Sequence, residues 1–276
     1  MRAPRPRGTP LNNARFEEWL APYSGYVVPV TRRKLELWIE QFDAGDCDVA
    51  ARILDAVLFL GHEHVRTTFR QLLPTLPNWN GDEAQRPGRW FFVPFSGSVG
   101  ESGDSMVHAF RMATGMTQRK FNHLFVHRSE LVSKRPGPDD TVVLIDDFSG
   151  TGTQATRAWR EVFAEILAEQ PEIILLLVAA TRDALTAINN NTEMQLTCGT
   201  LLENHHNLFH ATCTHFSQQE KQVVEDYCRR ADQRNPHGSG NSGLLIVFAH
   251  RCPNNSLPIL HADHARWSAL FPRDLG

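Results

Sequence analysis

The chain has 276 residues, 41% of them hydrophobic, and a formal net charge of −3 at pH 7. A charge so close to neutral gives no electrostatic footprint for nucleic acid, and five cysteines without a Cys-x-x-Cys pair indicate neither a disulfide framework nor a zinc knuckle. No apolar run approaches the roughly 20 residues that a membrane span needs. We therefore expect a cytoplasmic protein that does not enter a membrane.

The first third of the chain reads as a basic tail followed by helices. Residues 1–15 carry Arg2, Arg5 and Arg7, and we expect this tail to be disordered. Beyond it, apolar residues recur at helical spacing, which predicts a helical N-terminal region over residues 16–85. The Pro- and Gly-rich stretch 74–88 marks the boundary to a second domain, expected over residues 86–276.

Strand-like runs dominate the second domain. The first is Trp90 to Phe95, followed by the Ser/Gly-rich segment Ser96 to Gly103 and an amphipathic helix. Further runs predict strands over residues 124–126, 142–145, 172–180, 194–198 and 244–248, and a helix over residues 218–231. Repeating strand–helix units of this kind predict an α/β fold in which helices flank one parallel sheet.

The most informative segment is Thr141 to Gln154, TVVLIDDFSGTGTQ. Its apolar run is typical of a strand buried on both faces, and Asp146 and Asp147 follow at the carboxyl end, where open α/β sheets bind ligands. The two carboxylates could accept from two ribose hydroxyls or could hold a divalent cation such as Mg²⁺. A loop suited to phosphate comes next, because glycines, successive backbone N–H groups and a helix start favour an anion. The loop residues are Ser149, Gly150, Thr151, Gly152 and Thr153.

This segment resembles the ribose-5-phosphate motif of the phosphoribosyltransferases. Asp146 and Asp147 align with the acidic pair of that motif, and Thr151 and Gly152 with its turn, whereas Gly150 and Gln154 depart from the commoner residues. The resemblance implies a type I phosphoribosyltransferase-like sheet.

The same resemblance suggests further contacts to substrate phosphates. An earlier loop containing Ser98 would hold pyrophosphate oxygens, and a basic segment beginning near Arg128 could close over the leaving phosphate. Arg182 follows another strand end, from which it could reach a substrate phosphate.

Several segments together resemble a conflict-associated, phosphoribosyltransferase-like family of bacteria. They are Trp38-Ile-Glu-Gln-Phe42, Asp146 to Gly152, His250 to Pro258 and Trp267 to Arg273. The resemblance implies an effector or toxin of antiphage systems, retrons included, with a reverse transcriptase and its RNA or DNA product as a partner.

The C-terminal motif leaves two interpretations open. His250, Asn254 and Asn255 could form a polar hood over the substrate, or Pro-Asn-Asn could simply be a turn, because Asn and Pro favour turns on their own account.

Two functions are consistent with these patterns. In one, the protein is a transferase or glycosyl-bond-cleaving enzyme that binds a phosphoribosyl compound or nucleotide and acts at the anomeric carbon. In the other, the same pocket senses a nucleotide without catalysis and the protein acts through a partner. A second copy of the chain is a further candidate partner.

Overall fold

The computed structural model describes residues 1, 3–96 and 102–273. It divides the chain into two compact units. The sheet unit is Glu63–Leu202, and the helical unit combines Met1–His62 with Glu203–Gly276. Among the described residues, no helix has both the length and the apolar character needed to cross a membrane.

This division differs from the expected one at residue 85. The segment after residue 62 belongs with the sheet, because Phe69 packs edge-on against Phe110 with ring centroids 5.5 Å apart. The segment after residue 202 returns to the first helices, where the Trp38 indole N–H donates to the Ile259 carbonyl at 2.7 Å. Both boundaries depend on contacts between distant segments, which composition along the chain does not reveal.

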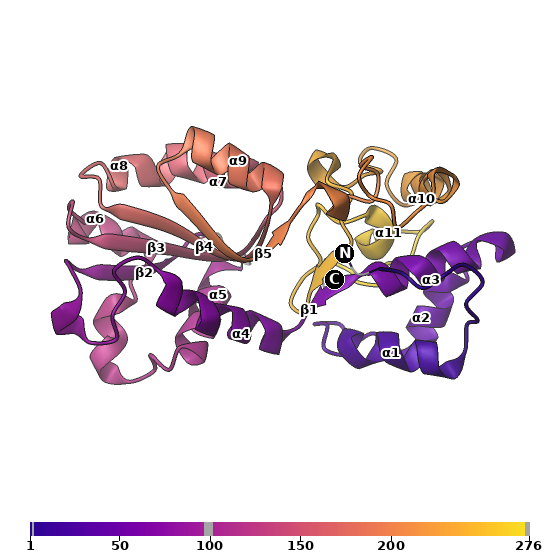
Figure 1. The fold of residues 1–276 in the computed structure, drawn as a ribbon, viewed down its shortest axis with the longest axis horizontal. Helices are drawn as coiled ribbons and strands as arrows, with labels where there is room; N and C mark the ends of the chain where they lie inside the picture. The colour runs from indigo at the N-terminus through magenta and orange to yellow at the C-terminus, as the bar shows by residue number, and fades with distance from the viewer. Residues whose placement is uncertain (2, 97–101, 274–276) are drawn as a thin grey trace. The chain divides into compact units, whose positions relative to one another are not determined.

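The sheet unit contains a parallel sheet with helices on both faces (Figure 1). Its strands are β2 (Trp90–Pro94), β3 (Thr141–Ser149), β4 (Glu172–Thr181) and β5 (Gln195–Leu202). Its helices are α4 (His62–Leu72), α5 (Gly103–Ala113), α6 (Leu131–Lys134), α7 (Thr153–Ala158), α8 (Ala164–Ile166) and α9 (Arg182–Asn191).

The strands follow the order β2-β3-β4-β5. On the other side of β2, Phe125 makes a single parallel bridge to Phe92, where the sequence predicts a strand over residues 124–126. The predicted strand does not form, because its first residue, Leu124, is the last residue of a 3-10 helix, Arg119–Leu124. The chain thus leaves β2 on one side and returns on the other as β3. This reversal is a topological switch point, and in open α/β sheets ligands bind beyond the strand ends at such a point.

Alternating side chains of the strands give the sheet two cores. On one face, Val93 and Leu144 pack with Trp159 and Phe163, which lie in a π-helical segment between α7 and α8. On the other face, the ring of Phe92 packs against the ring of Phe110 of α5 in a tilted arrangement, with centroids 4.9 Å apart. Both faces of β3 are therefore buried, as the continuous apolar run predicts.

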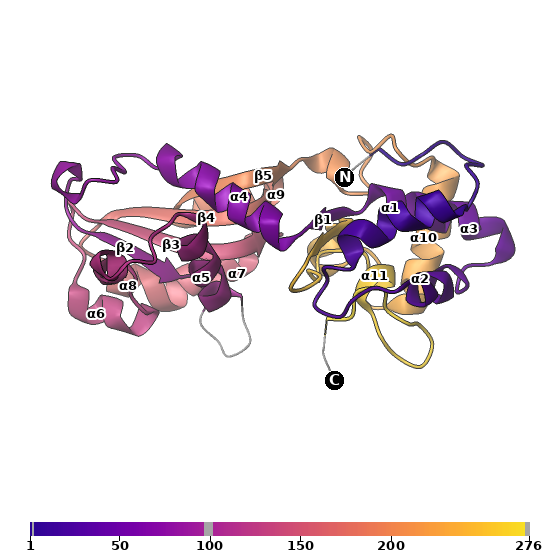
Figure 2. The ribbon, with the colours of Figure 1, turned by 90° about the horizontal axis from the view of Figure 1, so that it is seen from below.

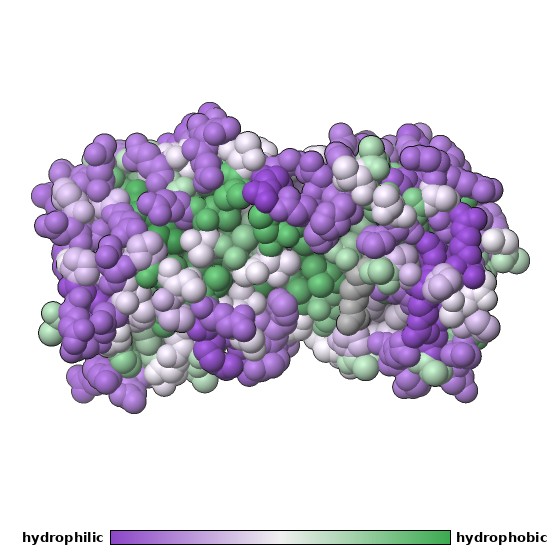
Figure 3. Space-filling view, in the orientation of Figure 1, coloured by the Kyte–Doolittle hydropathy of each residue, from purple (hydrophilic) through white to green (hydrophobic). Residues whose placement is uncertain are grey.

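β5 forms one edge of this sheet, and its residues are half-buried or exposed except at the last position. The face drawn in Figure 3 is mostly hydrophilic, and hydrophobic residues show through around β4 and β5. The exposure of this strand is consistent with its edge position.

The helical unit gathers the remaining elements. They are α1 (Asn13–Tyr23), α2 (Arg32–Ile39), α3 (Cys47–Ala56), β1 (Leu58–Leu60), α10 (Gln218–Ala231), β6 (Ile246–Phe248) and α11 (Pro258–His261). Helix α10 has the predicted bounds, and its capping box, formed by Ser217 and Glu220, explains where it begins. β6 does not join the main sheet as expected from the sequence, but pairs in parallel with β1.

Two sequence motifs meet in the core of the helical unit. The indole N–H groups of Trp38 and Trp267 both donate to the carbonyl of Ile259, at 2.7 and 3.0 Å. Nearby, Gln41 donates to Ser268 O at 3.0 Å and accepts from Ser268 N at 2.7 Å. The motifs around Trp38 and Trp267 are thus packing partners that hold the C-terminal segment against α2.

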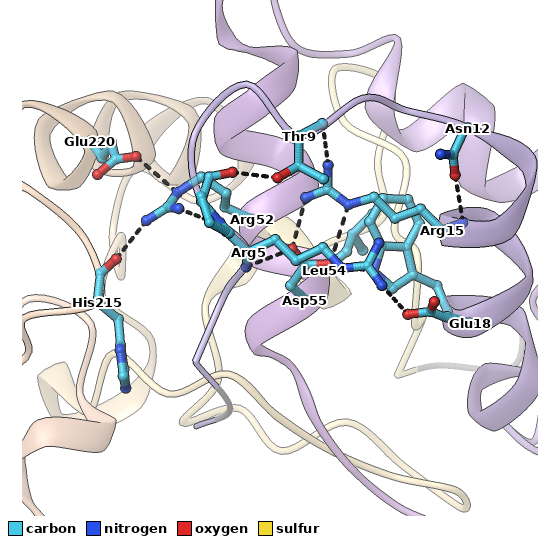
Figure 4. A network of polar contacts seen from close by, with 12 residues as sticks. Arg5, Thr9, Asn12, Arg15, Glu18, Arg52, Leu54, Asp55, His215 and Glu220 are labelled. Atoms are coloured by element: carbon cyan, nitrogen blue, oxygen red, sulfur yellow. Dashed lines mark hydrogen bonds and ion pairs between the residues drawn. The ribbon is translucent and has the colours of Figure 1, made fainter.

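The basic N-terminal segment is held by acidic partners, in contrast to the disorder expected for residues 1–15 (Figure 4). Arg15 is fully buried and bonds to Asp55 at 2.7 Å, and the backbone N–H of Arg5 also donates to Asp55, at 3.0 Å. Arg7 pairs with the buried Glu220 at 3.0 Å. Arg5, Arg7 and Arg15 thus have partners far away in the sequence, which a local view of composition cannot include.

Candidate functional site

Asp146 and Asp147 lie on β3 beside the switch point. β2 pairs with β3 as far as Ile145, whereas β4 continues to pair with it as far as Ser149. Within the described residues, β3 therefore has a neighbouring strand on only one side from Asp146 onward. The strand runs three positions beyond Asp146 because β4 is long enough to support it.

Ser102, immediately before α5, joins the two carboxylates. Its Oγ lies 2.5 Å from Oδ1 of Asp146 and 2.9 Å from Oδ1 of Asp147. A serine hydroxyl has one hydrogen and can donate to only one of the two carboxylates. The second close oxygen–oxygen contact is more favourable when one of the carboxyl groups carries a proton. The geometry favours a cluster of three oxygens in which the acidic pair retains one proton.

Asp146 is the aspartate better placed to hold that proton. It is 7% exposed, whereas Asp147 is half-buried. Burial, followed by the charge of Asp147, raises the pKa of Asp146 from its ordinary value of 3.8 to about 7. Both causes disfavour the ionised form of a carboxyl group.

The loop after β3 is held in a conformation that only glycine fits at position 152. Gly152 has φ of +73°, and a Cβ at this position would lie 2.8 Å from the Cβ of Ala187, so a side chain there would be both strained and crowded. The side chain of Thr181, at the end of β4, donates to Gly150 O and accepts from Ala184 N at 3.0 Å. This threonine fixes the loop to the start of α9, and α7 begins directly after the loop.

A pocket of about 410 Å³ opens beside this arrangement. Its polar lining includes Ser96, Arg128, Asp146, Ser149 and Gln154, and apolar side chains of β3, β4 and α7 form part of its wall. The pocket therefore brings one aspartate, the first loop residue and one of the predicted basic residues to a common space. Such a space can hold an anionic group beside a sugar.

A comparison with protein-family models identifies the family of this chain. The family model PRTase-CE matches residues 35–273, which covers most of both units. The chain belongs to the PRTase-CE family. The match and the parallel α/β sheet together identify a phosphoribosyltransferase-like domain, as the sequence motif predicts. A comparison with curated proteins finds no match.

The remaining predicted residues of this PRTase-CE protein lie in three places. Arg182 is the first residue of α9, next to the Thr181 that holds the loop. Ser98 lies outside the described residues. His250, Asn254 and Asn255 belong to the helical unit, in the segment that follows β6.

Within that segment, Asn255 is engaged by its own unit. Its side-chain amide donates to Ser239 O at 2.9 Å and to Ser242 Oγ at 3.0 Å, and Asn254 O accepts from Ser239 N at 2.7 Å. His250 lies near the ring of Phe248, with centroids 5.5 Å apart. These bonds favour the turn interpretation for the two asparagines, because the Asn255 amide donates within a buried turn.

Sequence reasoning missed Ser96, Ser102 and Thr181. Ser96 accepts from Gly103 N at 2.8 Å, which fixes the start of α5 close to the acidic pair. The signal was present in part, since serine is common before helices and at strand ends. What the pattern does not show is that these hydroxyls, two from the segment between β2 and α5 and one from the end of β4, converge on the two motifs of β3.

The acidic pair also meets the first requirement of a magnesium site. Mg²⁺ is commonly bound through one or two carboxylates together with substrate phosphates. Among the described residues, no group of three or more acidic, histidine or cysteine side chains could hold a metal ion. Asp146 and Asp147 therefore fit an ion that arrives with a phosphate ligand, and the shared proton would have to leave first.

Proposed function

We propose that the sheet unit binds a compound carrying a 5-phosphoribosyl group and makes or breaks the bond at its anomeric carbon. The observation that supports this most is the position of Asp146 and Asp147, which follow the last residue of β3 paired with β2 and lie beside the switch point. Asp147 and the loop that follows lie beside a pocket that Asp146 and Ser149 line. The membership of the PRTase-CE family agrees with this reading.

The loop Ser149 to Thr153 would hold the 5-phosphate. Its glycines allow close backbone approach, and the N-terminal end of α7 favours negative charge. Because Thr181 fixes Gly150 through its carbonyl, the loop is organised before a ligand arrives. Such preorganisation lowers the entropic cost of binding.

Asp146 and Asp147 would hold the two ribose hydroxyls. A vicinal diol brings two O–H donors, so each carboxylate could accept one of them in place of the Ser102 hydroxyl. The binding of the diol would therefore replace the proton arrangement that Ser102 holds in the free protein.

Reaction at an anomeric carbon passes through a cationic, oxocarbenium-like state. The negative charge on the acidic pair would stabilise this state more than the neutral ground state, and Arg128 in the pocket wall would attract an anionic leaving group. Mg²⁺, when bound by Asp146 and Asp147, would supply charge neutralisation on a diphosphate leaving group.

In the cell we propose that the protein is an antiphage effector. Consumption of a nucleotide or its precursor would stop growth of an infected cell, and the family resemblance suggests a reverse transcriptase with its RNA or DNA product as partner. A homodimer is a further proposed assembly.

Metabolite profiling of cells that express the protein in its defence system tests the activity. Wild type and the matched control Asp139→Asn, an exposed aspartate outside the site, should deplete the same nucleotide pool, and Asp147→Asn should not. Calorimetry with ribose 5-phosphate and 5-phosphoribosyl diphosphate measures binding in the same variants. If Asp147→Asn depletes the pool and binds the ligands as wild type does, the acidic pair has no role in the activity. Binding without any change in metabolites would assign the pocket to nucleotide sensing.

A further inference from the structure

A second cavity, in the helical unit, has five arginines in its lining. It has a volume of about 770 Å³ and lies where the C-terminal end of α10 meets the chain around α11. The two helices lie side by side in both ribbon views (Figures 1 and 2). Its arginines come from separate segments: Arg229, Arg230, Arg234, Arg266 and Arg273.

The lining of the cavity carries a net positive charge. Asp232 and Asp263 are the acidic lining residues, against five arginines, and both carboxylates are occupied by backbone N–H groups. Asp232 accepts from Arg234 N at 2.9 Å, and Asp263 accepts from Ala269 N at 3.3 Å. These bonds shape the loops and leave the arginines in excess.

Two of the arginines are available to a ligand. Arg229 pairs with Glu225 at 2.5 Å and Arg230 with Asp43 at 3.6 Å. Arg234 and Arg266 are exposed, and neither has a carboxylate partner within 4.0 Å in the part of the chain that the structure describes. Their guanidinium groups can therefore accept an anion without breaking an existing ion pair.

The cavity wall is held in place by histidines. His264 Nδ1 accepts from Arg266 N at 3.1 Å, so its Nε2 carries the hydrogen and donates to Ala231 O at 2.7 Å. His261 Nε2 lies 3.2 Å from Ser256 O. The loop that carries Arg266 is thus bonded to the last turn of α10. This bond holds the two segments that carry arginines against each other.

We propose that this cavity binds a group of adjacent phosphates, such as the triphosphate of a nucleotide or consecutive phosphates of a nucleic-acid strand. Guanidinium groups recognise phosphate through pairs of N–H donors, and several of them in one cavity favour a multiply charged anion over a single carboxylate. The described lining has no Phe, Tyr or Trp ring, and its apolar residues are Ala231 and Ala262. It therefore offers more charge to phosphates than apolar surface to a base.

Isothermal titration calorimetry with the full chain tests this site. The probes are tripolyphosphate, a nucleoside triphosphate and a short single-stranded oligothymidylate, each at about 0.1 M salt, where long-range attraction between exposed charges is largely screened. The double variant Arg234→Ala/Arg266→Ala should bind at least one probe tenfold or more weakly than wild type. The matched control Arg33→Ala/Arg66→Ala removes two exposed arginines elsewhere and should stay within twofold.

The relative affinities identify the source of the phosphates. Tighter binding of tripolyphosphate and triphosphate assigns a nucleotide, and tighter binding of the oligonucleotide assigns a strand. The proposal is overturned if wild type binds none of the probes, or if both double variants lose affinity equally, since the second result would mean a general effect of charge. Thermal unfolding of both variants checks that the fold is kept.

Discussion

At the scale of single residues, the main property of the acidic pair is its protonation state. One Ser102 hydroxyl lies between two carboxylates, and the more buried carboxyl has the raised pKa. Burying a protonated carboxyl group costs less free energy than burying an ionised one. The pair therefore has a protonation state that a ligand or cation must change on binding.

Asp146→Asn should change how stability depends on pH. Because the folded pKa is about 7 and the ordinary value is 3.8, the folded state retains a proton that the unfolded state loses between these values. The contribution of Asp146 to stability therefore falls as pH rises through this window, by at most about 4 kcal/mol at 1.36 kcal/mol per pKa unit. Relative to wild type, Asp146→Asn should be more stable at pH 8 than at pH 4.5, as measured by urea unfolding.

The control for this experiment is Asp139→Asn, an exposed aspartate outside the site, measured at the same two pH values. If Asp146→Asn shows no change between the two pH values, the carboxyl is ionised throughout and the shared proton is disproved.

At the scale of elements, the loop between β3 and α7 is fixed by its neighbours more than by its own residues. The Gly152 position faces α9, where Ala184 and Ala187 leave no room for a side chain. The small residues of α9 therefore help to set the conformation of the loop. Close helix packing and the backbone conformation of the loop therefore depend on the same position.

Gly152→Ala should weaken phosphate binding and lower stability together. The variant must accommodate a Cβ at positive φ and 2.8 Å from another Cβ, and strain of this kind costs on the order of 1–3 kcal/mol. Gly81→Ala is the matched control, because no heavy atom lies within 4 Å of a Cβ there. Chemical unfolding and calorimetry with ribose 5-phosphate measure both effects. If the folded fraction of Gly152→Ala binds ribose 5-phosphate as tightly as wild type does, the loop is only a connector.

The turn after β6 can be tested in the same way. Asn255→Ala removes two hydrogen bonds of a buried side chain and leaves the half-buried Ser239 carbonyl without that donor, which should cost about 1–3 kcal/mol. Asn254→Ala changes an exposed side chain and should stay within about 0.5 kcal/mol of wild type. A stable Asn255→Ala protein that loses ligand binding would support the hood over the turn.

At the scale of the whole molecule, the helical unit is assembled from both ends of the chain. The N-terminal arginines, α3 and α10 share two buried acidic groups, Asp55 and Glu220 (Figure 4). Glu220 also closes the capping box of α10. The pKa of Glu220 is lowered by the hydrogen bond from Arg7 and by bonds from Ser217, which together outweigh its burial.

Asp55→Ala should destabilise the helical unit strongly. The variant leaves Arg15 buried without its carboxylate and removes the acceptor of the Trp19 indole N–H at 3.0 Å. Breaking a buried pair in this way costs about 3–5 kcal/mol. Glu17→Ala, at an exposed ion pair with Arg32, should change stability by less than about 1 kcal/mol. Similar unfolding free energies for the two variants would mean that the Arg15–Asp55 pair contributes little.

The sequence alone determined the local chemistry of this protein. The apolar run, the acidic pair and the Gly/Thr loop of residues 141–154 can be read directly, because strand period, backbone freedom and charge are local properties. The bounds of α10 follow from its capping residues for the same reason. The family resemblance rests on these segments too.

Only the tertiary structure decided which segments meet. Ser102 and Thr181 converge on the acidic pair and the loop from other strand ends, β6 pairs with β1 outside the main sheet, and Trp38 and Trp267 share one carbonyl. Each of these contacts joins residues far apart in the chain, and their stability comes from burial and pairing in the folded state. A local pattern contains neither, because the same serine, strand or tryptophan could have packed against other partners.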